Sequence, residues 1–225
     1  MIYVVVPVFN EEAIQLRQNL LALLKFHYNI VLVNDGWNKE LKESIADLPI
    51  HYIRHSVNLG QGAALQTGVE YALLHNAEFI VHFDADGQHN PENIADLIKP
   101  LINGEAEIAL GSRFLANNTV KEIPPFRRFI LFLARFVNYI FTGMLLSDAH
   151  NGLRAMTRKA AEQIFLTENS YAHATQILSE IRKNKLNYKE IPVTIYYSQY
   201  STNKGQKSFN MFNIFLDLIL NKIFR

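Results

Sequence analysis

Short β-rich runs alternate with amphipathic helical segments through the first half of the chain, and this alternation restricts the fold more than any other feature. The segment 11–27, for example, repeats apolar residues at three- and four-residue spacing, which is typical of a helix. Strands that are joined through helices run parallel, with helices on both faces of the sheet. The pattern predicts an α/β domain with a mostly parallel central sheet, whose strands we expect at 2–8, 29–35, 49–55, 78–83 and 106–112.

The remaining segments are assigned in the same way. We expect Asn58 to cap the helix over 60–76. The second half of the chain is less regular, and its main feature is a long apolar helical region over 124–146. Further expected helices cover 39–47, 91–102, 171–184 and 208–225, and a further strand covers 188–197.

Polar residues follow the end of every strand in the first half. One such end would be an ordinary turn, since Asp, Asn and Gly are turn formers. Five in succession indicate a binding site, because ligands of parallel sheets bind at the carboxyl ends of the strands. The five ends read "PVFNEE", "VNDG", "HSVNLGQG", "DADGQH" and "GSR".

Asp84 and Asp86 stand two apart behind the apolar run "EFIVHF". Two like charges so close repel each other unless a positive group lies between them. Carboxylate oxygens suit hard divalent cations such as Mg²⁺ or Mn²⁺, and phosphate oxygens and water would complete the coordination shell. The pair predicts a metal that carries a diphosphate, and the alternative is a solvated surface turn.

Composition and motifs exclude several classes of protein. A net charge of +1 argues against a general nucleic-acid binder, and the absence of cysteine excludes disulfides and thiolate metal sites. A dinucleotide-binding motif would need glycine where Leu65 stands after "GQG", and no P-loop pattern occurs. The opening residues lack a basic region before the apolar run, so we interpret them as a strand and not as a signal peptide.

The ordered motifs resemble those of the family 2 glycosyltransferases, over roughly residues 2–210. Within the family, the dolichol- or polyprenyl-phosphate sugar transferases and bacterial envelope-polysaccharide enzymes are the most similar branch. The motifs that carry the resemblance are "VVVPVFNEE", "VNDG", "NLGQGAALQTG", "DADGQHNPE", "GSRF" and "DAHNGLRAMTRKA".

The resemblance implies a GT-A fold and a metal-dependent transfer that inverts the anomeric configuration. The donor would be a UDP- or GDP-sugar, and the acceptor a polyprenyl phosphate or a cell-envelope glycan. Residues 1–112 would bind the donor and residues 113–207 the acceptor, with an amphipathic helix at 208–225.

The family also implies roles for single residues. Asp35 would contact the base, Arg113 would bind phosphate, and Asp148 would be the acceptor-side base. His150 is a second candidate for the base, since histidine titrates near neutral pH; the alternative is an ordinary loop histidine. The resemblance assigns the metal to Asp84 and Asp86, and donor binding to Pro7, Phe9, Asn10, Glu11, Asp35, Gln61, Asp84 and Arg154.

Two positions depart from the family pattern. Trp37 stands where serine is usual, and Gln61 stands where lysine is frequent. The first change removes an expected helix cap, and the second removes a positive charge near the nucleotide. Both bear on which nucleotide is bound more than on activity.

The apolar helix over 126–146 bears on the acceptor. Arg127, Arg128 and Arg135 share a narrow arc of this helix with Asn138 and Thr142, and most of the remaining surface is apolar. Such a stripe predicts a helix at a membrane surface, and hence a cytoplasmic enzyme at the inner face of the membrane. The alternative is a helix buried against the sheet or against a second subunit in a homodimer.

Two other functions share some of these features. A sugar-nucleotide nucleotidyltransferase also uses an α/β sheet and a metal, but it should carry a basic, glycine-rich loop where "PVFNEE" stands. A non-catalytic nucleotide-sugar-binding module would be expected to lose the paired aspartates or Asp148, and both are present.

Overall fold

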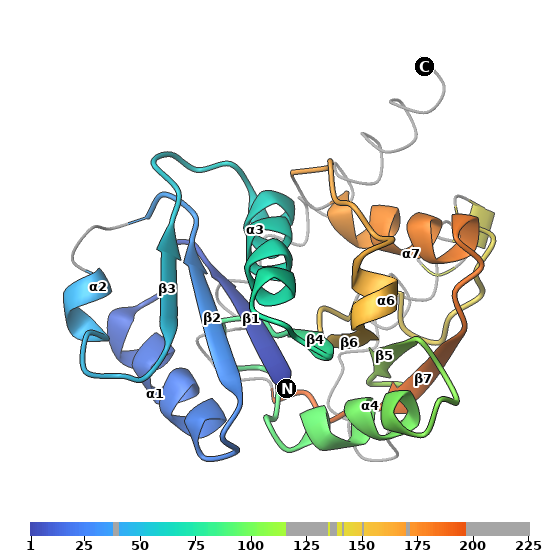
Figure 1. Ribbon diagram of the computed structural model, residues 1–225, viewed down its shortest axis with the longest axis horizontal. Coiled ribbons are helices and arrows are strands. Elements are labelled where there is room, and N and C mark those ends of the chain that lie inside the picture. Colours follow the sequence, from blue (N-terminus) through green and yellow to red (C-terminus); the bar gives the residue numbers. More distant parts are fainter. Residues whose placement is uncertain are drawn as a thin grey trace.

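The computed structural model describes residues 1–37, 41–115, 135, 139–140, 142–149, 151–169 and 172–196. Within these residues the chain forms an α/β domain, in which a single sheet has helices on both faces (Figure 1). The strands are β1 (Ile2–Val8), β2 (Asn29–Asn34), β3 (His51–Arg54), β4 (Phe79–His82), β5 (Ile108–Ser112), β6 (Arg154–Thr157) and β7 (Tyr188–Pro192). The helices are α1 (Ala13–Leu24), α2 (Leu41–Ser44), α3 (Gln61–Leu74), α4 (Asn93–Ile102), α6 (Arg158–Ala161) and α7 (His173–Lys183).

The seven strands lie in the order β3-β2-β1-β4-β6-β5-β7. Strand β6 runs antiparallel to both of its neighbours, β4 and β5, and all the other pairs are parallel. Because β6 is reversed, its first residue lies at the edge where the other strands end. Arg154 therefore pairs with His82, the last residue of β4. The five polar strand ends found in the sequence all lie at this edge of the sheet.

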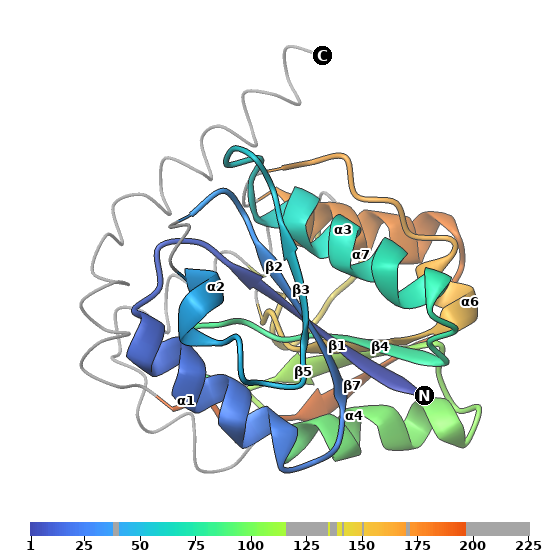
Figure 2. The same cartoon turned by 60° about the vertical axis from the view of Figure 1, so that its left-hand side comes forward.

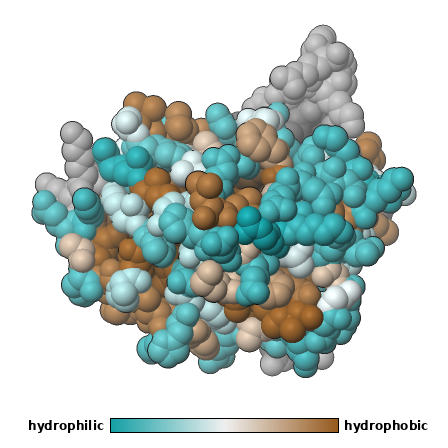
Figure 3. All heavy atoms as spheres, viewed as in Figure 1, coloured by the Kyte–Doolittle hydropathy of each residue, from teal (hydrophilic) through white to brown (hydrophobic). Residues whose placement is uncertain are grey.

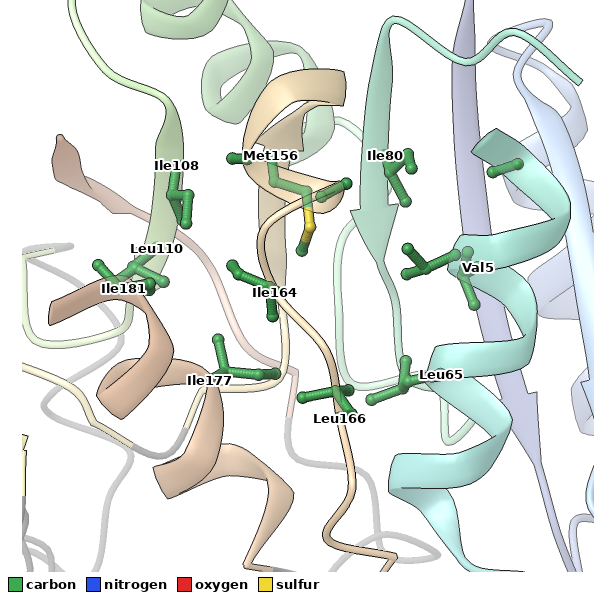
Figure 4. Packing of buried hydrophobic residues seen from close by; sticks show 14 of the residues in the cluster. Val5, Leu65, Ile80, Ile108, Leu110, Met156, Ile164, Leu166, Ile177 and Ile181 are labelled. Carbon is green, nitrogen blue, oxygen red and sulfur yellow. The ribbon is translucent and has the colours of Figure 1, made fainter. Parts of the chain in front are cut away.

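Two hydrophobic cores hold helices to the sheet. Helices α3, α6 and α7 cover one face, while α1 and α4 cover the other (Figure 2). On the first face, Val5 and Ile80 of neighbouring strands belong to the same buried core as Leu65 of α3, and residues of α7 extend this core (Figure 4). Burial on both faces explains why β1, β2 and β5 are almost uninterrupted apolar runs.

The predicted α/β fold with a mostly parallel sheet is confirmed, and the boundaries differ from the predicted ones by a few residues. Strand β6 and helix α6 were not predicted. The strand has only four residues and begins with a buried arginine, so it carries no clear alternation. The prediction that Asn58 caps α3 is wrong: the N-cap residue is Gly60, with φ of 101° and no capping side chain.

Other predictions fall outside the described residues. They include most of the 126–146 helix, with Arg127 and Arg128, and the whole of 208–225. In the part of the chain that the structure describes, no helix is long and apolar enough to cross a membrane. On the face shown in Figure 3, hydrophobic and hydrophilic residues are interspersed.

Candidate active site

The paired aspartates lie at the carboxyl edge of the sheet, directly after β4. The backbone turns at 85–87, where Gly87 has φ of 74°. Asp84 Oδ2 lies 3.1 Å from His89 Nε2, and Asp84 Oδ1 accepts a hydrogen bond of 3.1 Å from Gln61 Nε2. The Asp84 side chain is 30% exposed, so a ligand can still reach its oxygens.

Asp86 is held by the residues that follow it. Its Oδ1 accepts a hydrogen bond from the Gln88 backbone at 3.0 Å, and its Oδ2 accepts one from Gln88 Nε2 at 2.7 Å. Burial raises the pKa of Asp86, and the charges of Asp84 and Glu11 raise it further. The two carboxylates therefore repel each other across the turn, as the sequence predicted.

Neighbouring positive groups lower the pKa of Asp84. Burial alone would raise its pKa, but the hydrogen bond from His89 and the charges of His89, His173 and Arg154 lower it. Burial lowers the pKa of Arg154 to about 10, so this guanidinium stays protonated at neutral pH. The positive charge of Arg154 thus interacts favourably with Asp84 and with Asp148.

His82 shares this buried region. Neither of its ring nitrogens has a hydrogen-bond partner among the described residues. Burial, together with the charges of Arg154 and His173, lowers the pKa of His82 to about 3, so the ring is neutral at physiological pH. His82 consequently adds no charge to the site, whereas Arg154 does.

Gly152 packs directly on Asp84. A Cβ atom at position 152 would lie 2.1 Å from Asp84 Oδ2, far inside van der Waals contact. Gly152 of "NGLR" therefore lies against Asp84, and Arg154 of the same motif acts on Asp84 through its charge.

Asp148 and Arg113 form a buried ion pair. Asp148 Oδ2 accepts hydrogen bonds from Arg113 Nε at 2.6 Å and from the Arg113 backbone at 3.1 Å. The Asp148 side chain is 1% exposed and the Arg113 side chain is 9% exposed. The pair ties the loop that contains Asp148 to the end of β5.

Glu190 of β7 fixes the same loop from the other side. Its carboxylate accepts hydrogen bonds from Ser147 N at 2.8 Å, from Ser147 Oγ at 2.6 Å and from Asp148 N at 3.3 Å. Ser147 Oγ also lies 2.6 Å from Ser112 Oγ at the end of β5. Glu190 was not predicted, because it lies 42 residues from Asp148 in the sequence and reaches it only through the β5–β7 pairing.

We expect Glu190→Ala to lower the free energy of unfolding by about 1–3 kcal/mol, since several donors lose their acceptor. Urea denaturation checks this value, with Glu43→Ala as the control because Glu43 is exposed on α2. Equal stability of the two variants would show that the Glu190 network contributes nothing to holding the loop.

Asp35 ends up inside the protein. It is 2% exposed, and its carboxylate accepts hydrogen bonds from Leu59 N at 2.9 Å and Gly60 N at 2.7 Å, with His55 Nδ1 at 2.8 Å. These contacts tie the loop before α3 to the end of β2. In the first turn of α3, Gly62 N donates a hydrogen bond of 3.2 Å to the carbonyl oxygen of Asn169, so this amide has an acceptor without a capping side chain.

The end of β1 contributes the remaining predicted donor-site residues. Pro7 is buried within the strand, while Phe9 and Asn10 are exposed directly after it. Asn10 has a φ of 55°, which turns the chain at this point. Glu11 lies near enough to Asp86 to raise its pKa.

The side chains of the site supply only part of the coordination shell that a divalent metal needs. No group of three or more His, Cys, Asp or Glu residues that could hold a metal occurs among the described residues. Asp84 and Asp86 offer oxygen ligands whose mutual repulsion a cation would relieve, and oxygen ligands suit Mg²⁺ and Mn²⁺. The donor set therefore fits such an ion when a diphosphate supplies further oxygens.

The structure brings most of the predicted site residues to one edge of the sheet, around Asp84. His150 lies outside the described residues. Sequence reasoning missed Gln88, His89, Gly152, Glu190 and His173, and the charge of His173 acts on Asp84. His89 and Gln88 could have been found, since both stand within five residues of the paired aspartates.

Comparison with protein families gives a match over most of the chain. The model of the family described as "Glycosyl transferase family 2" matches residues 3–165. That span runs from β1 to β6 and includes every predicted site residue, the paired aspartates and Asp148 among them.

Individual relatives agree with this match. The chain is 31% identical over 244 residues to the UDP-N-acetylglucosamine–dolichyl-phosphate N-acetylglucosaminyltransferase of Methanococcus voltae, covering 99% of this chain and 96% of the relative. It is 27% identical to the polyprenol monophosphomannose synthase of Mycolicibacterium smegmatis, covering 89% and 79%.

Among solved structures, glucosyl-3-phosphoglycerate synthase from Mycobacterium tuberculosis has the same fold. The TM-score is 0.68 at 14% identity, and the match covers 88% of this chain and 72% of the other. That enzyme was crystallised with Mn²⁺, UDP and glucosyl-3-phosphoglycerate.

Proposed function

The chain belongs to glycosyl transferase family 2, and from that premise we propose that it transfers a sugar from a nucleoside-diphosphate donor to a polyprenyl or dolichyl phosphate. It is an enzyme, a glycosyltransferase with a GT-A fold, and not a nucleotidyltransferase or a non-catalytic binding module. The donor, the metal, the acceptor and the roles of single residues are our proposal.

On the donor side, Asp84 and Asp86 would hold Mg²⁺ or Mn²⁺ together with the diphosphate of the nucleotide sugar. When bound, the ion neutralises the charge of the leaving diphosphate. Arg154 is a buried cation, and its charge favours the ionised form of Asp84. Gln61 holds Asp84 in place by a hydrogen bond, where a lysine in the same position would have added a charge.

On the acceptor side, a lipid phosphate oxygen would attack the anomeric carbon of the sugar. The bond from that carbon to the diphosphate oxygen breaks, and the nucleoside diphosphate leaves with the electron pair. A single displacement of this kind inverts the anomeric configuration. A phosphate at neutral pH is already anionic, so the attack needs positioning and not a general base.

The geometry of Asp148 supports an acceptor of this kind. Its Oδ2 is occupied by two hydrogen bonds from Arg113, and its side chain is 1% exposed. We propose that Asp148 orients Arg113, and that Arg113 in turn faces the acceptor phosphate. A hydroxyl acceptor would instead need a base that is free to take a proton, which leaves that role to His150.

A lipid acceptor also requires an apolar surface near the site. Tyr139, Ile140 and Leu145 are large apolar residues that are exposed close to Asp148 in the sequence. They lie in the C-terminal part of the segment that predicts a membrane-surface helix. We propose that this part of the chain meets the inner face of the membrane and receives the polyprenyl chain.

The observation that carries the proposal is the pair of partly accessible carboxylates at the carboxyl edge of the sheet, in a chain similar over 99% of its length to a dolichyl-phosphate sugar transferase. Release of nucleoside diphosphate from a panel of UDP- and GDP-sugars tests it. We expect release only when Mg²⁺ or Mn²⁺ and polyprenyl phosphate are both present. Equal release in the presence and absence of polyprenyl phosphate would contradict the proposed acceptor.

We expect Asp35→Ala to weaken nucleoside-diphosphate binding on the order of 10-fold, because the amides of Leu59 and Gly60 lose their acceptor and the loop before α3 loosens. Calorimetric titration of the folded variant measures the affinity. Asp47→Ala is the control, since Asp47 is 63% exposed and pairs with Arg17 away from the site. Unchanged affinity in Asp35→Ala would remove Asp35 from the donor site.

A further inference from the structure

Two aromatic rings stand together at the ends of β1 and β2. Phe9 follows β1 and Trp37 follows β2, and the last residues of these strands, Val8 and Asn34, are direct neighbours in the sheet. The ring centroids lie 5.6 Å apart with an angle of 70° between the ring planes, which is an edge-to-face contact. Phe9 is 45% exposed and Trp37 is partly exposed.

The backbone around Trp37 is fixed by several contacts. Trp37 N donates a hydrogen bond of 2.8 Å to Asn34 Oδ1, and Asn34 Nδ2 donates one of 2.9 Å to Tyr52. Gly36 has φ of 74°, and a Cβ there would lie 2.3 Å from the backbone carbon of Val57. Trp37 is therefore presented by a specific turn and not by a loosely held loop.

Asp35, the acid beside this pair, is buried. Asp35 is 2% exposed, because its carboxylate is bound by Leu59, Gly60 and His55. The surface that the ends of β1 and β2 offer to a ligand consequently contains both aromatic rings, together with the exposed Asn10. A nucleobase fits such a surface, since base–aromatic stacking stabilises binding whatever the base.

We propose that Trp37, flanked by Phe9, packs against the base of the donor nucleotide and determines much of the donor affinity. This inference rests on the proposed nucleotide-sugar donor and adds a residue that departs from the family pattern, where serine is usual. Because every base has an aromatic face, the contact strengthens binding of purine and pyrimidine nucleotides alike.

The chain has a single tryptophan, so its intrinsic tryptophan fluorescence reports on Trp37 alone. Titration of the wild-type protein with UDP or GDP in Mg²⁺ should change the emission saturably, at the same concentrations at which calorimetry detects binding. Inorganic diphosphate with Mg²⁺ should leave the emission nearly unchanged, because it has no base to contact the ring.

Two variants test the affinity. Trp37→Ser should weaken UDP and GDP binding by about 5- to 100-fold, and Trp37→Phe should keep most of it. Phe26→Ser is the matched control, since Phe26 forms another partly exposed aromatic pair, with Tyr28, just before the start of β2. Circular dichroism establishes that each variant is folded.

The outcomes separate this inference from the proposed function. Calorimetric binding of UDP or GDP with no change in emission, or with equal affinity in Trp37→Ser, overturns the role of Trp37 and leaves the donor class standing. If neither nucleotide binds the wild-type protein and no nucleotide sugar is turned over, the proposed function fails and this inference fails with it.

Discussion

Replacing either Asp84 or Asp86 by asparagine is expected to lower the rate of sugar transfer by at least about 100-fold, or roughly 3 kcal/mol of transition-state stabilisation. Asparagine keeps the size of the side chain but loses the charge that holds a divalent ion. It also relieves the repulsion that raises the pKa of Asp86. Folding should therefore be retained while metal-dependent transfer is lost.

The matched control is Asp96→Asn, because Asp96 is exposed on α4 and outside the candidate site. Its transfer rate should equal that of the wild type. Titration with Mn²⁺ in the presence of UDP should show weaker metal binding in Asp84→Asn and Asp86→Asn, and wild-type metal binding in Asp96→Asn. Full wild-type activity in excess EDTA would contradict the proposed metal site.

Gly152→Ala should be nearly as damaging, although glycine carries no chemistry of its own. The added Cβ would lie 2.1 Å from Asp84 Oδ2, so the Asp84 carboxylate or the backbone at position 152 must move. A displacement of about 1 Å at a reacting centre can cost about 100-fold in rate. Overpacking should also lower the free energy of unfolding by about 1–3 kcal/mol.

A double-mutant cycle isolates this contact. When Asp84 is replaced by alanine, the carboxylate atoms that clash with the added Cβ are gone, and most of the destabilisation by Gly152→Ala should disappear. Urea denaturation of the wild type, the two single variants and the double variant gives the coupling energy. If Gly152→Ala destabilises both backgrounds equally, Gly152 does not act through Asp84.

The first half of the fold could be predicted because strands and helices alternate regularly and the longer elements carry clear apolar patterns. Helix α1 buries Leu16, Leu20 and Leu23, as its three- and four-residue spacing predicts. The rule that ligands bind at the carboxyl ends of parallel strands placed Asp84 and Asp86 at the right edge of the sheet. Strand β6 was not predicted because it begins with Arg154 and lacks the apolar run that marks β4, a strand of equal length.

Contacts within the site depend on topology and could not be predicted from spacing. Glu190 reaches Ser147 only because β5 pairs with β7. Gly152 meets Asp84 because β6 runs antiparallel to β4 and brings the preceding loop under the turn. The direction of the Asp35 side chain is similarly unpredictable, since a strand-end aspartate can bind a ligand or the neighbouring loop.

The chemical form of the lipid product tests the central claim most directly. The wild-type protein is incubated with a nucleotide sugar, Mg²⁺ and polyprenyl phosphate, and the organic extract is analysed by mass spectrometry. The proposed reaction predicts a lipid whose mass has increased by one sugar residue with no added phosphorus, together with one equivalent of nucleoside diphosphate. A lipid that has gained a sugar phosphate, with nucleoside monophosphate as the second product, would contradict it, as would a sugar found only on a water-soluble acceptor.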